Sequence, residues 1–408
     1  MRIDFEGLFA AGLPAASGRP APLPRYNFTG GNNDPAIVPV EALVDSAQRV
    51  LRAEGRDLAI YNLGKGGLGH PGLRAFVARK LSEQRGMAET ADDILITSGS
   101  GQGLNLVNET LLEPGDTVLM EQFSYSAAIK RVRQLGVEVV GIPLDGHGLR
   151  MDVVATTLER MKAAGVRPKY IYTIPTIQNP TGSVMPLERR HELLRLSAAY
   201  GVPIFEDECY ADLLWEGDWP TAIRGLPGGE DVIHVGSFSK SLAPALRLGY
   251  VAAPWTVMGR LLALKQDGGT PAIEQMIVAD FFGAHFDEHV QTLKKGLKRK
   301  AEVLMEALKE HFGTAAEFRT PVGGIFLWVE LPPQVDTQSL YAKAAAEGVA
   351  FNPGPEWSTD HEPAKHSLRL CFALPPEADI REGVARLAEI CHRETGIPLR
   401  SGNVARAG

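Results

Sequence analysis

Seven short apolar runs, rich in β-branched and aromatic residues, recur through the first two thirds of the chain. Segments with helical periodicity, such as 101–112 and 187–201, separate most of these runs. Short apolar strands that alternate with helices are typical of a mostly parallel sheet with helices on both faces. The pattern therefore predicts an α/β fold whose strands lie at 94–98, 117–121, 137–143, 170–175, 202–208, 232–237 and 248–254.

The pattern changes near residue 285, which indicates a second domain. Residues 285–312 have the periodicity of one long amphipathic helix, and a hairpin near 320–331, a helix, an apolar run at 367–374 and a final helix follow. A single core seldom grows beyond roughly 250–300 residues, and this chain has 408. We therefore expect an N-terminal arm at 1–38 that joins the small domain, a large domain at 39–285 and a small α+β domain at 286–408.

The composition argues against a nucleic-acid-binding or membrane protein. The formal net charge is −7, whereas a nucleic-acid surface normally carries a basic stripe. No run approaches the ~18 apolar residues of a membrane helix, and the N-terminus lacks the basic region of a secretory signal. The three cysteines do not have the spacing of a metal site. These features predict a cytoplasmic protein without a metal site.

Two glycine-rich stretches have patterns that are found in phosphate-binding loops. The stretch "GKGGLG" at 64–69 matches G-x-G-x-x-G, but Asp92 and Asp93 precede the next strand and no acidic residue ends it, so a nicotinamide site is not favoured. The stretch "TSGSGQG" at 97–103 lies between a strand and a helix. Backbone N–H groups there could bind an anion with help from the Ser100 hydroxyl, although an ordinary turn explains the stretch as well.

Polar residues also follow three of the predicted strands. Asn179 stands in "IQNPTG", Asp207 and Tyr210 in "FEDECYADL", and Lys240 in "SFSKSLAPALRLGY". Taken singly, these segments read as a turn, a solvated strand end and a surface charge. A lysine in a desolvated, partly cationic site is nevertheless a good nucleophile, and the planar fork of Arg247 suits a phosphate.

The order of these segments gives them a joint meaning. The chain contains, in this order, a phosphate-type turn, Asn179, Asp207 with Tyr210 three residues on, and Ser-x-Ser-Lys with Arg247 seven residues after Lys240. This order resembles that of the fold-type I pyridoxal-phosphate enzymes of the class I/II aminotransferase group. The chain is most similar to the aminoadipate/kynurenine aminotransferase-like branch, which also resembles the aminotransferase-like domain of some bacterial regulators. The likeness covers roughly 26–395 and includes "NFTGGNNDPAIVPVEAL", "GHPGLRAFVA" and "LRLCFAL". It implies a large domain built on a mostly parallel seven-stranded sheet and a smaller α+β C-terminal domain.

The resemblance also implies a role for each residue around the cofactor, pyridoxal 5′-phosphate. Lys240 would form the Schiff base with the cofactor's aldehyde and then act as the base that moves the substrate's Cα proton. Asp207 would face the pyridine nitrogen and keep it protonated. Asn179 and Tyr210 would donate hydrogen bonds to the phenolic oxygen, and Tyr125 would stack on the ring.

The same resemblance assigns the two ends of the site. The phosphate would be held by Ser100, Gly101, Ser237, Ser239 and Arg247. At the other end, Arg369 would bind the substrate's α-carboxylate through two parallel bonds, and Gly31 and Asn179 would lie beside the substrate.

One position departs from the family's pattern. The family usually has a tyrosine about ten residues before the "LR" of "GxxxLR", and this tyrosine reaches the phosphate of the neighbouring subunit. Here Tyr61 precedes Arg74 by thirteen residues, with extra glycines between them. Tyr61 is the best candidate for this role, and a site completed by a neighbour implies a homodimer.

The resemblance implies an aminotransferase that moves the amino group of an α-amino acid to a 2-oxo acid in a ping-pong reaction. Other chemistry on an amino acid stays open, such as β-elimination, decarboxylation or oxidation, because the cofactor carries the reaction and the pocket steers it. A ligand sensor without enzymatic activity is a second alternative. Such regulators carry a DNA-binding module ahead of this domain, whereas only about 25 residues precede "NFTGG" here. The sequence does not specify the substrate's side chain.

Overall fold

The computed structural model describes residues 3–10, 13–14, 16–19 and 22–399. Its centre is a seven-stranded sheet with the order β2-β10-β9-β8-β7-β3-β4. Only β10 is antiparallel to its neighbours, and the other pairs are parallel. The predicted α/β fold and all seven apolar runs are confirmed, since the strands are β2 (Ile94–Thr97), β3 (Thr117–Glu121), β4 (Glu138–Ile142), β7 (Ile171–Thr173), β8 (Ile204–Asp207), β9 (Ile233–Ser237) and β10 (Gly249–Ala252).

Alternate side chains of these strands enter three hydrophobic clusters, one on one face of the sheet and two on the other. On one face they pack against α3 (Ser100–Leu111), α4 (Ser126–Gln134) and α7 (Trp255–Leu264). The opposite face is covered by α5 (Met151–Ala163) and α6 (Leu187–Tyr200) over one half and by α2 (Pro71–Arg85) and part of α8 over the other. Burial on both faces explains why the strands read as continuous apolar runs.

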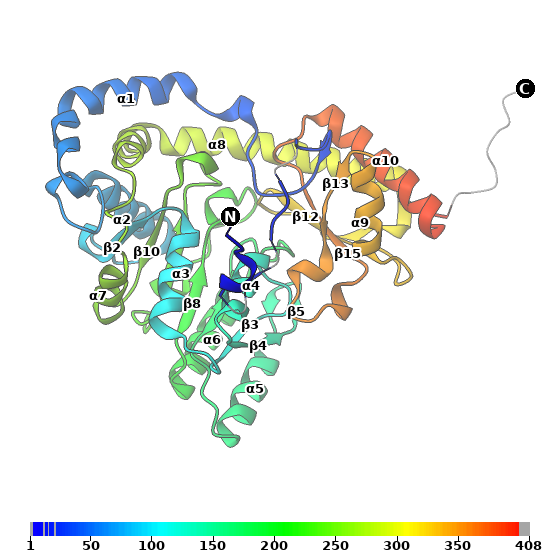
Figure 1. Cartoon of the computed structure of the whole chain (residues 1–408), viewed down its shortest axis with the longest axis horizontal. Helices are drawn as coiled ribbons and strands as arrows, with labels where there is room; N and C mark the ends of the chain where they lie inside the picture. The colour runs from blue at the N-terminus through cyan, green and yellow to red at the C-terminus, as the bar shows by residue number, and fades with distance from the viewer. Residues whose placement is uncertain (1–2, 11–12, 15, 20–21, 400–408) are drawn as a thin grey trace, which may run out of the picture.

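A smaller antiparallel sheet forms the C-terminal part, in the order β11-β12-β15-β14. The predicted hairpin is the β11–β12 pair, and the predicted run at 367–374 contains β15. Two helices, α9 (Thr337–Ala346) and α10 (Glu377–Thr395), accompany this sheet (Figure 1). The strands are β11 (Glu317–Phe318), β12 (Phe326–Glu330), β14 (Asn352–Pro353) and β15 (Ser367–Cys371).

The helix α8 (Ala272–His311) joins the two parts. It starts at Ala272, earlier than the expected residue 285, and packs against α1 (Val40–Glu54) and α2 on one side and α10 on the other. Figure 1 shows α8 running along the molecule beneath α1 toward α10. No described helix is long and apolar enough to span a bilayer. Because α8 crosses residue 285, the boundary there stays a prediction.

Short pairs of strands complete the fold. The arm forms β1 (Tyr26–Asn27), which pairs in parallel with β13 (Val349–Ala350) of the C-terminal part. A second pair, β5 (Leu144–Asp145) and β6 (Gly148–Leu149), lies beyond β4. The arm continues from β1 to Gly31, whose carbonyl oxygen accepts a hydrogen bond from Lys240 just beyond the carboxyl end of β9. The carboxyl ends of the strands are where open α/β sheets bind their ligands.

Candidate active site

A cavity of about 380 Å³ opens at the carboxyl edge of the central sheet, between the large and the small parts. All of the predicted site residues except Tyr61 line it. They are Gly31, Ser100, Gly101, Tyr125, Asn179, Asp207, Tyr210, Ser237, Ser239, Lys240, Arg247 and Arg369.

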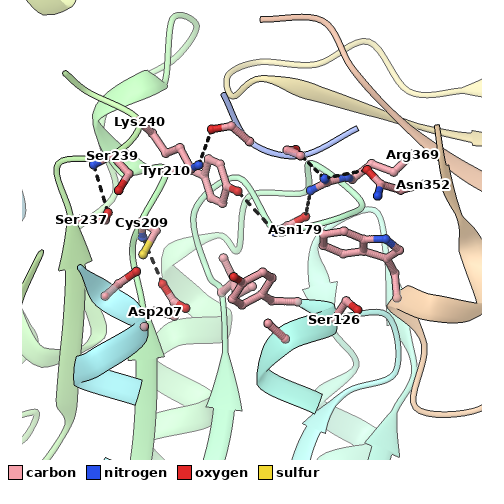
Figure 2. A pocket seen from close by; sticks show the side chains of 18 of the residues that line it. Ser126, Asn179, Asp207, Cys209, Tyr210, Ser237, Ser239, Lys240, Asn352 and Arg369 are labelled. Carbon is pink, nitrogen blue, oxygen red and sulfur yellow. Dashed lines mark hydrogen bonds between the residues drawn. The ribbon is translucent and has the colours of Figure 1, made fainter. Parts of the chain in front are cut away.

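Lys240 follows the end of β9 and extends into this cavity. Its Nζ donates a hydrogen bond to the carbonyl oxygen of Gly31 at 2.5 Å, so the amine touches the N-terminal arm (Figure 2). A β-carbon at Gly31 would collide with that same Nζ, so a larger residue there would displace the lysine from its present position. Burial lowers the pKa of Lys240, because removal from water disfavours the charged amine. The structure thus presents a lysine that loses its proton more easily than a surface lysine does.

Asp207 ends β8 and lies across the cavity from the arm (Figure 2). Its side chain is 3% exposed. One carboxylate oxygen accepts a hydrogen bond from the hydroxyl of Tyr172 at 2.7 Å, and the other accepts from the backbone N–H of Cys209 at 3.2 Å. Burial raises the pKa of Asp207. A buried acid fixed by two donors is suited to face a cationic ring nitrogen, whose charge would favour the ionised carboxylate.

A chain of hydrogen bonds connects the large part to the small one across the cavity. Asn179 donates to the hydroxyl of Tyr210 at 3.4 Å and accepts from Nη1 of Arg369 at 2.9 Å. The Nη2 of Arg369 donates to the carbonyl of Gly30 at 2.7 Å and to the amide oxygen of Asn352 at 3.0 Å. Figure 2 shows Arg369 between Asn179 and Asn352. The guanidinium is therefore held by contacts from three separate segments.

The surroundings of Arg369 favour an anionic ligand. The side chain is 2% exposed and lies 3.7 Å from the ring centroid of Trp357. Its Nε is buried and has no hydrogen-bond partner in the described part of the chain. A buried guanidinium without a carboxylate partner is costly, and a substrate carboxylate would relieve that cost through a bidentate pair.

The other end of the cavity is built around the first turn of α3. No side chain caps the helix, so the backbone N–H groups of Ser100 and Gly101 at its start are available to bind an anion. Gly99 precedes the helix with a φ of 76°, and a β-carbon there would lie 2.6 Å from Nη2 of Arg247. Arg247 therefore lies against the start of the helix.

Hydroxyl groups complete this end of the cavity. Ser100 begins α3, and Ser237 and Ser239 flank the end of β9, where the Ser237 hydroxyl accepts from the backbone N–H of Ser239 at 3.1 Å. Free N–H groups, three hydroxyls and one guanidinium form the donor set that a phosphate dianion requires. The residues present thus fit pyridoxal phosphate at both its phosphate and its reactive end.

Several lining residues were missed by the sequence analysis. Asn352 lies in β14 of the small sheet, where it pairs directly with Arg369, and Trp357 ends the 3-10 turn Gly354–Trp357 that follows β14. Cys209 also lines the cavity. Its position in the sequence between Asp207 and Tyr210 could have identified it as a residue of the site. The remaining missed residues are Gly30, Ser126, Ala127, Lys130, Arg131 and Ile174.

Tyr61 lies outside this cavity. It begins a 3-10 turn at Tyr61–Gly64 and is 85% exposed. Its predicted role concerns the neighbouring subunit and stays a prediction. Among the described residues, no group of three or more His, Cys, Asp or Glu side chains could hold a metal ion.

The carboxyl edge of this mostly parallel sheet carries a buried amine, Lys240, a buried acid, Asp207, and the donors around the start of α3, which we call the anion cradle. This combination defines the fold-type I class of pyridoxal-phosphate enzymes. The chain belongs to one family of that class, the class I and II aminotransferases, whose model matches residues 26–387. The resemblance found in the sequence is confirmed. The protein is a pyridoxal-phosphate-dependent aminotransferase.

Known proteins support this assignment along nearly the whole chain. Aromatic-amino-acid aminotransferase 1 of Thermococcus litoralis is 34% identical over 371 residues, which is 90% of this chain and 88% of that protein. The structure of a multiple substrate aminotransferase from Thermococcus profundus has 32% identity and a TM-score of 0.88, and the match covers 97% of this chain and 100% of that one. The α-aminoadipate aminotransferase of Thermus thermophilus, complexed with N-(5′-phosphopyridoxyl)-L-leucine, has 30% identity and a TM-score of 0.83, with coverage of 95% and 98%.

Proposed function

We propose that Lys240 is the residue that binds the cofactor covalently and then moves the proton of the substrate's Cα. The observation that carries this proposal is the position of its Nζ, inside the cavity and against Gly31, in surroundings that lower its pKa. When bound, pyridoxal phosphate supplies an electron-accepting ring that stabilises negative charge at Cα. Lys240 supplies what the ring lacks, a neutral amine within reach of the Cα proton.

The other residues hold and orient the reactants in this proposal. Asp207 binds the ring nitrogen, while Asn179 and Tyr210 donate to the phenolic oxygen. Tyr125 covers one face of the ring and excludes water from it. The start of α3, with Ser100 and Gly101, and the group Ser237, Ser239 and Arg247 bind the phosphate.

Arg369 binds the α-carboxylate of an α-amino acid and, in the second half of the reaction, that of a 2-oxo acid. It exchanges part of its present hydrogen bonding to Asn352 or Gly30 for the substrate's oxygens. The aromatic rings of Tyr125 and Trp357, both in the lining, offer apolar contacts to a side chain. The names of the similar proteins make aromatic amino acids and 2-aminoadipate the first substrates to test.

The proposal includes a homodimer in the cytoplasm. Tyr61 is exposed in the single subunit. This exposure is required of a residue that contacts a neighbouring subunit. The free thiols of Cys209, Cys371 and Cys391 agree with a reducing compartment.

Borohydride reduction of the holoenzyme tests the assignment of Lys240. Reduction should fix the cofactor to the protein, and peptide mapping should find it on the peptide that contains Lys240. Lys130 provides a sharp internal comparison, because it is the other lysine of the cavity lining. A label on Lys130 or on any other lysine overturns the assignment. Lys240→Arg should remain unlabelled while it still binds the cofactor.

A further inference from the structure

Arg131 of α4 lines the cavity, and none of the roles described above uses it. Its Nη1 is buried and has no hydrogen-bond partner among the described residues. Among the described residues, no Asp or Glu forms an ion pair with Arg131. The neighbouring Arg133 points elsewhere and donates to the carbonyl oxygen of Thr359. A half-buried guanidinium that lacks a counter-charge is costly, so its surroundings favour an anionic ligand.

The position of Arg131 identifies which end of the cavity this ligand occupies. A β-carbon at Gly101 would lie 3.2 Å from Nη2 of Arg131, and one at Gly99 would lie 2.6 Å from Nη2 of Arg247. The two guanidinium groups therefore flank the first turn of α3. Arg369 is bonded instead to Asn179, Gly30 and Asn352, at the other end of the site.

We propose that Arg131 is a second guanidinium that binds the cofactor's phosphate, together with Arg247 and the start of α3. The proposal rests on the cofactor orientation proposed above. Two guanidinium charges and the positive end of a helix match a phosphate dianion better than one guanidinium does, and the pair would neutralise it. The unpartnered Nη1 provides a donor for a phosphate oxygen.

The alternative ligand for Arg131 is a carboxylate on the substrate's side chain. The contact with Gly101 favours the phosphate, because Gly101 belongs to the helix start that already provides free N–H donors. The experiment below separates the two ligands.

The test compares pyridoxal phosphate with pyridoxal, which lacks the phosphate, in absorbance titrations of the cofactor-free enzyme. Arg131→Met should weaken the binding of pyridoxal phosphate by about 10- to 100-fold, as expected for loss of a charged hydrogen bond. It should leave the affinity for pyridoxal unchanged. Arg131→Lys should recover part of the loss, since it retains the charge without the planar fork. Arg133→Gln, on the same helix, serves as the matched control.

Inorganic phosphate gives a second measurement that does not depend on the titration. Phosphate should raise the melting temperature of the cofactor-free wild-type enzyme more than that of Arg131→Met. Equal loss of affinity for both pyridoxal compounds would mean a structural role and would overturn the proposal. Unchanged affinity for pyridoxal phosphate with a raised KM for dicarboxylic amino acids would assign Arg131 to the substrate instead. A wrong assignment of Lys240 can be told apart from a wrong assignment of Arg131. The first would place the borohydride label on another lysine, and this result does not depend on which residue stands at position 131.

Discussion

At the scale of single residues, the proposed chemistry depends on Lys240, which lies in a cavity with several other cationic groups. Burial is the main cause of its lowered pKa, and the charges of Arg369 and Arg247 act in the same direction. In the unfolded chain the same amine has an ordinary pKa of about 10.4. The native state therefore binds this proton more weakly than the unfolded state does.

This difference predicts a pH-dependent effect of Lys240→Met on the cofactor-free enzyme. Below the unfolded pKa, the unfolded chain is stabilised by protonation more than the native state is, so native stability is lost as the pH falls. Removal of the amine should abolish this pH-dependent loss of native stability. The variant should melt above the wild type at pH 7, by on the order of 2 °C, and the gap should narrow as the pH approaches 10.

Differential scanning calorimetry at both pH values measures this gap. Lys295→Met, at an exposed position of α8, should show the same melting temperature difference at pH 7 and pH 10. A Lys240→Met enzyme that melts below the wild type by the same margin at both pH values would contradict a lowered pKa. The loss of the hydrogen bond to Gly31 would then outweigh the relief of charge burial.

Arg369 leads to a second prediction at this scale. Arg369→Ala should raise the KM for the amino acid by about thirtyfold or more, because truncating one partner of a buried charge pair costs about 2–5 kcal/mol. The affinity for the cofactor should stay within a few-fold of the wild type. Steady-state kinetics and a cofactor titration on the same preparations measure the two quantities. Loss of the cofactor with an unchanged KM would show that Arg369 does not bind the carboxylate.

The residues of this site differ in how well the sequence could predict them. Lys240, Asp207, Asn179 and Arg247 follow or precede strands of the central sheet, and parallel strands bring their carboxyl ends to one edge. Asn352 depended on the pairing register of β14 with β15, which no spacing in the sequence specifies. Trp357 and Arg131 also depended on tertiary packing, and each looks like an ordinary residue in the sequence.

At the scale of secondary structure elements, the phosphate end of the site depends on how closely β10 approaches the first turn of α3. Gly249 begins β10, and a β-carbon there would collide with the backbone nitrogen of Ser100 and with the carbonyl carbon of Gly99. Backbone atoms cannot move aside as a flexible side chain can. The contact therefore fixes the position of the N–H groups that we propose to bind the phosphate.

Gly249→Ala should consequently displace the start of α3 and weaken cofactor binding at least about tenfold. The matched control is Gly259→Ala in α7, where a β-carbon would meet nothing within 4 Å. That variant should bind the cofactor normally and gain about 0.5–1 kcal/mol of stability, because alanine favours the helix over glycine. Fluorescence titration with pyridoxal phosphate compares the two. Normal binding by Gly249→Ala would show that the helix start tolerates displacement.

The elements themselves were predictable to different degrees. The seven strands were found because they are short, apolar and bounded by turns. The start of α8 was placed too late, because residues 272–284 are largely apolar and include five buried residues, Gln275, Met276, Val278, Phe281 and Phe282. A helix that is buried on much of its surface loses the periodicity that marks an amphipathic helix. The β1–β13 pair was missed as a contact since two-residue strands leave no pattern.

At the scale of the whole molecule, the active site lies where the arm, the large part and the small part meet. The arm contributes the carbonyls of Gly30 and Gly31, which accept from Arg369 and Lys240. The large part contributes the lysine and the anion cradle, and the small part contributes Arg369. The proposed roles of these residues therefore require all three parts in their native arrangement.

The proposed homodimer adds a contribution from the neighbouring subunit. If Tyr61 completes the neighbour's site, a hybrid of Lys240→Ala and Tyr61→Phe subunits has one site with both native residues. Equal mixing gives half hybrids, so about a quarter of all sites should be native. Activity should rise above the mean of the two parent variants. Sedimentation equilibrium checks that the enzyme is a dimer, and no rise on mixing in a dimer that exchanges subunits would contradict the role of Tyr61.

The most direct test of Lys240-dependent transamination is the half-reaction of the purified holoenzyme with single amino acids, without any 2-oxo acid. We expect a subset of a panel that includes aromatic amino acids and 2-aminoadipate to convert the absorbance of the bound cofactor to that of pyridoxamine phosphate. Addition of a 2-oxo acid should restore the original spectrum, and Lys240→Ala should show neither change. Release of ammonia with no spectral conversion would contradict transamination, and conversion at an undiminished rate in Lys240→Ala would contradict the role of Lys240.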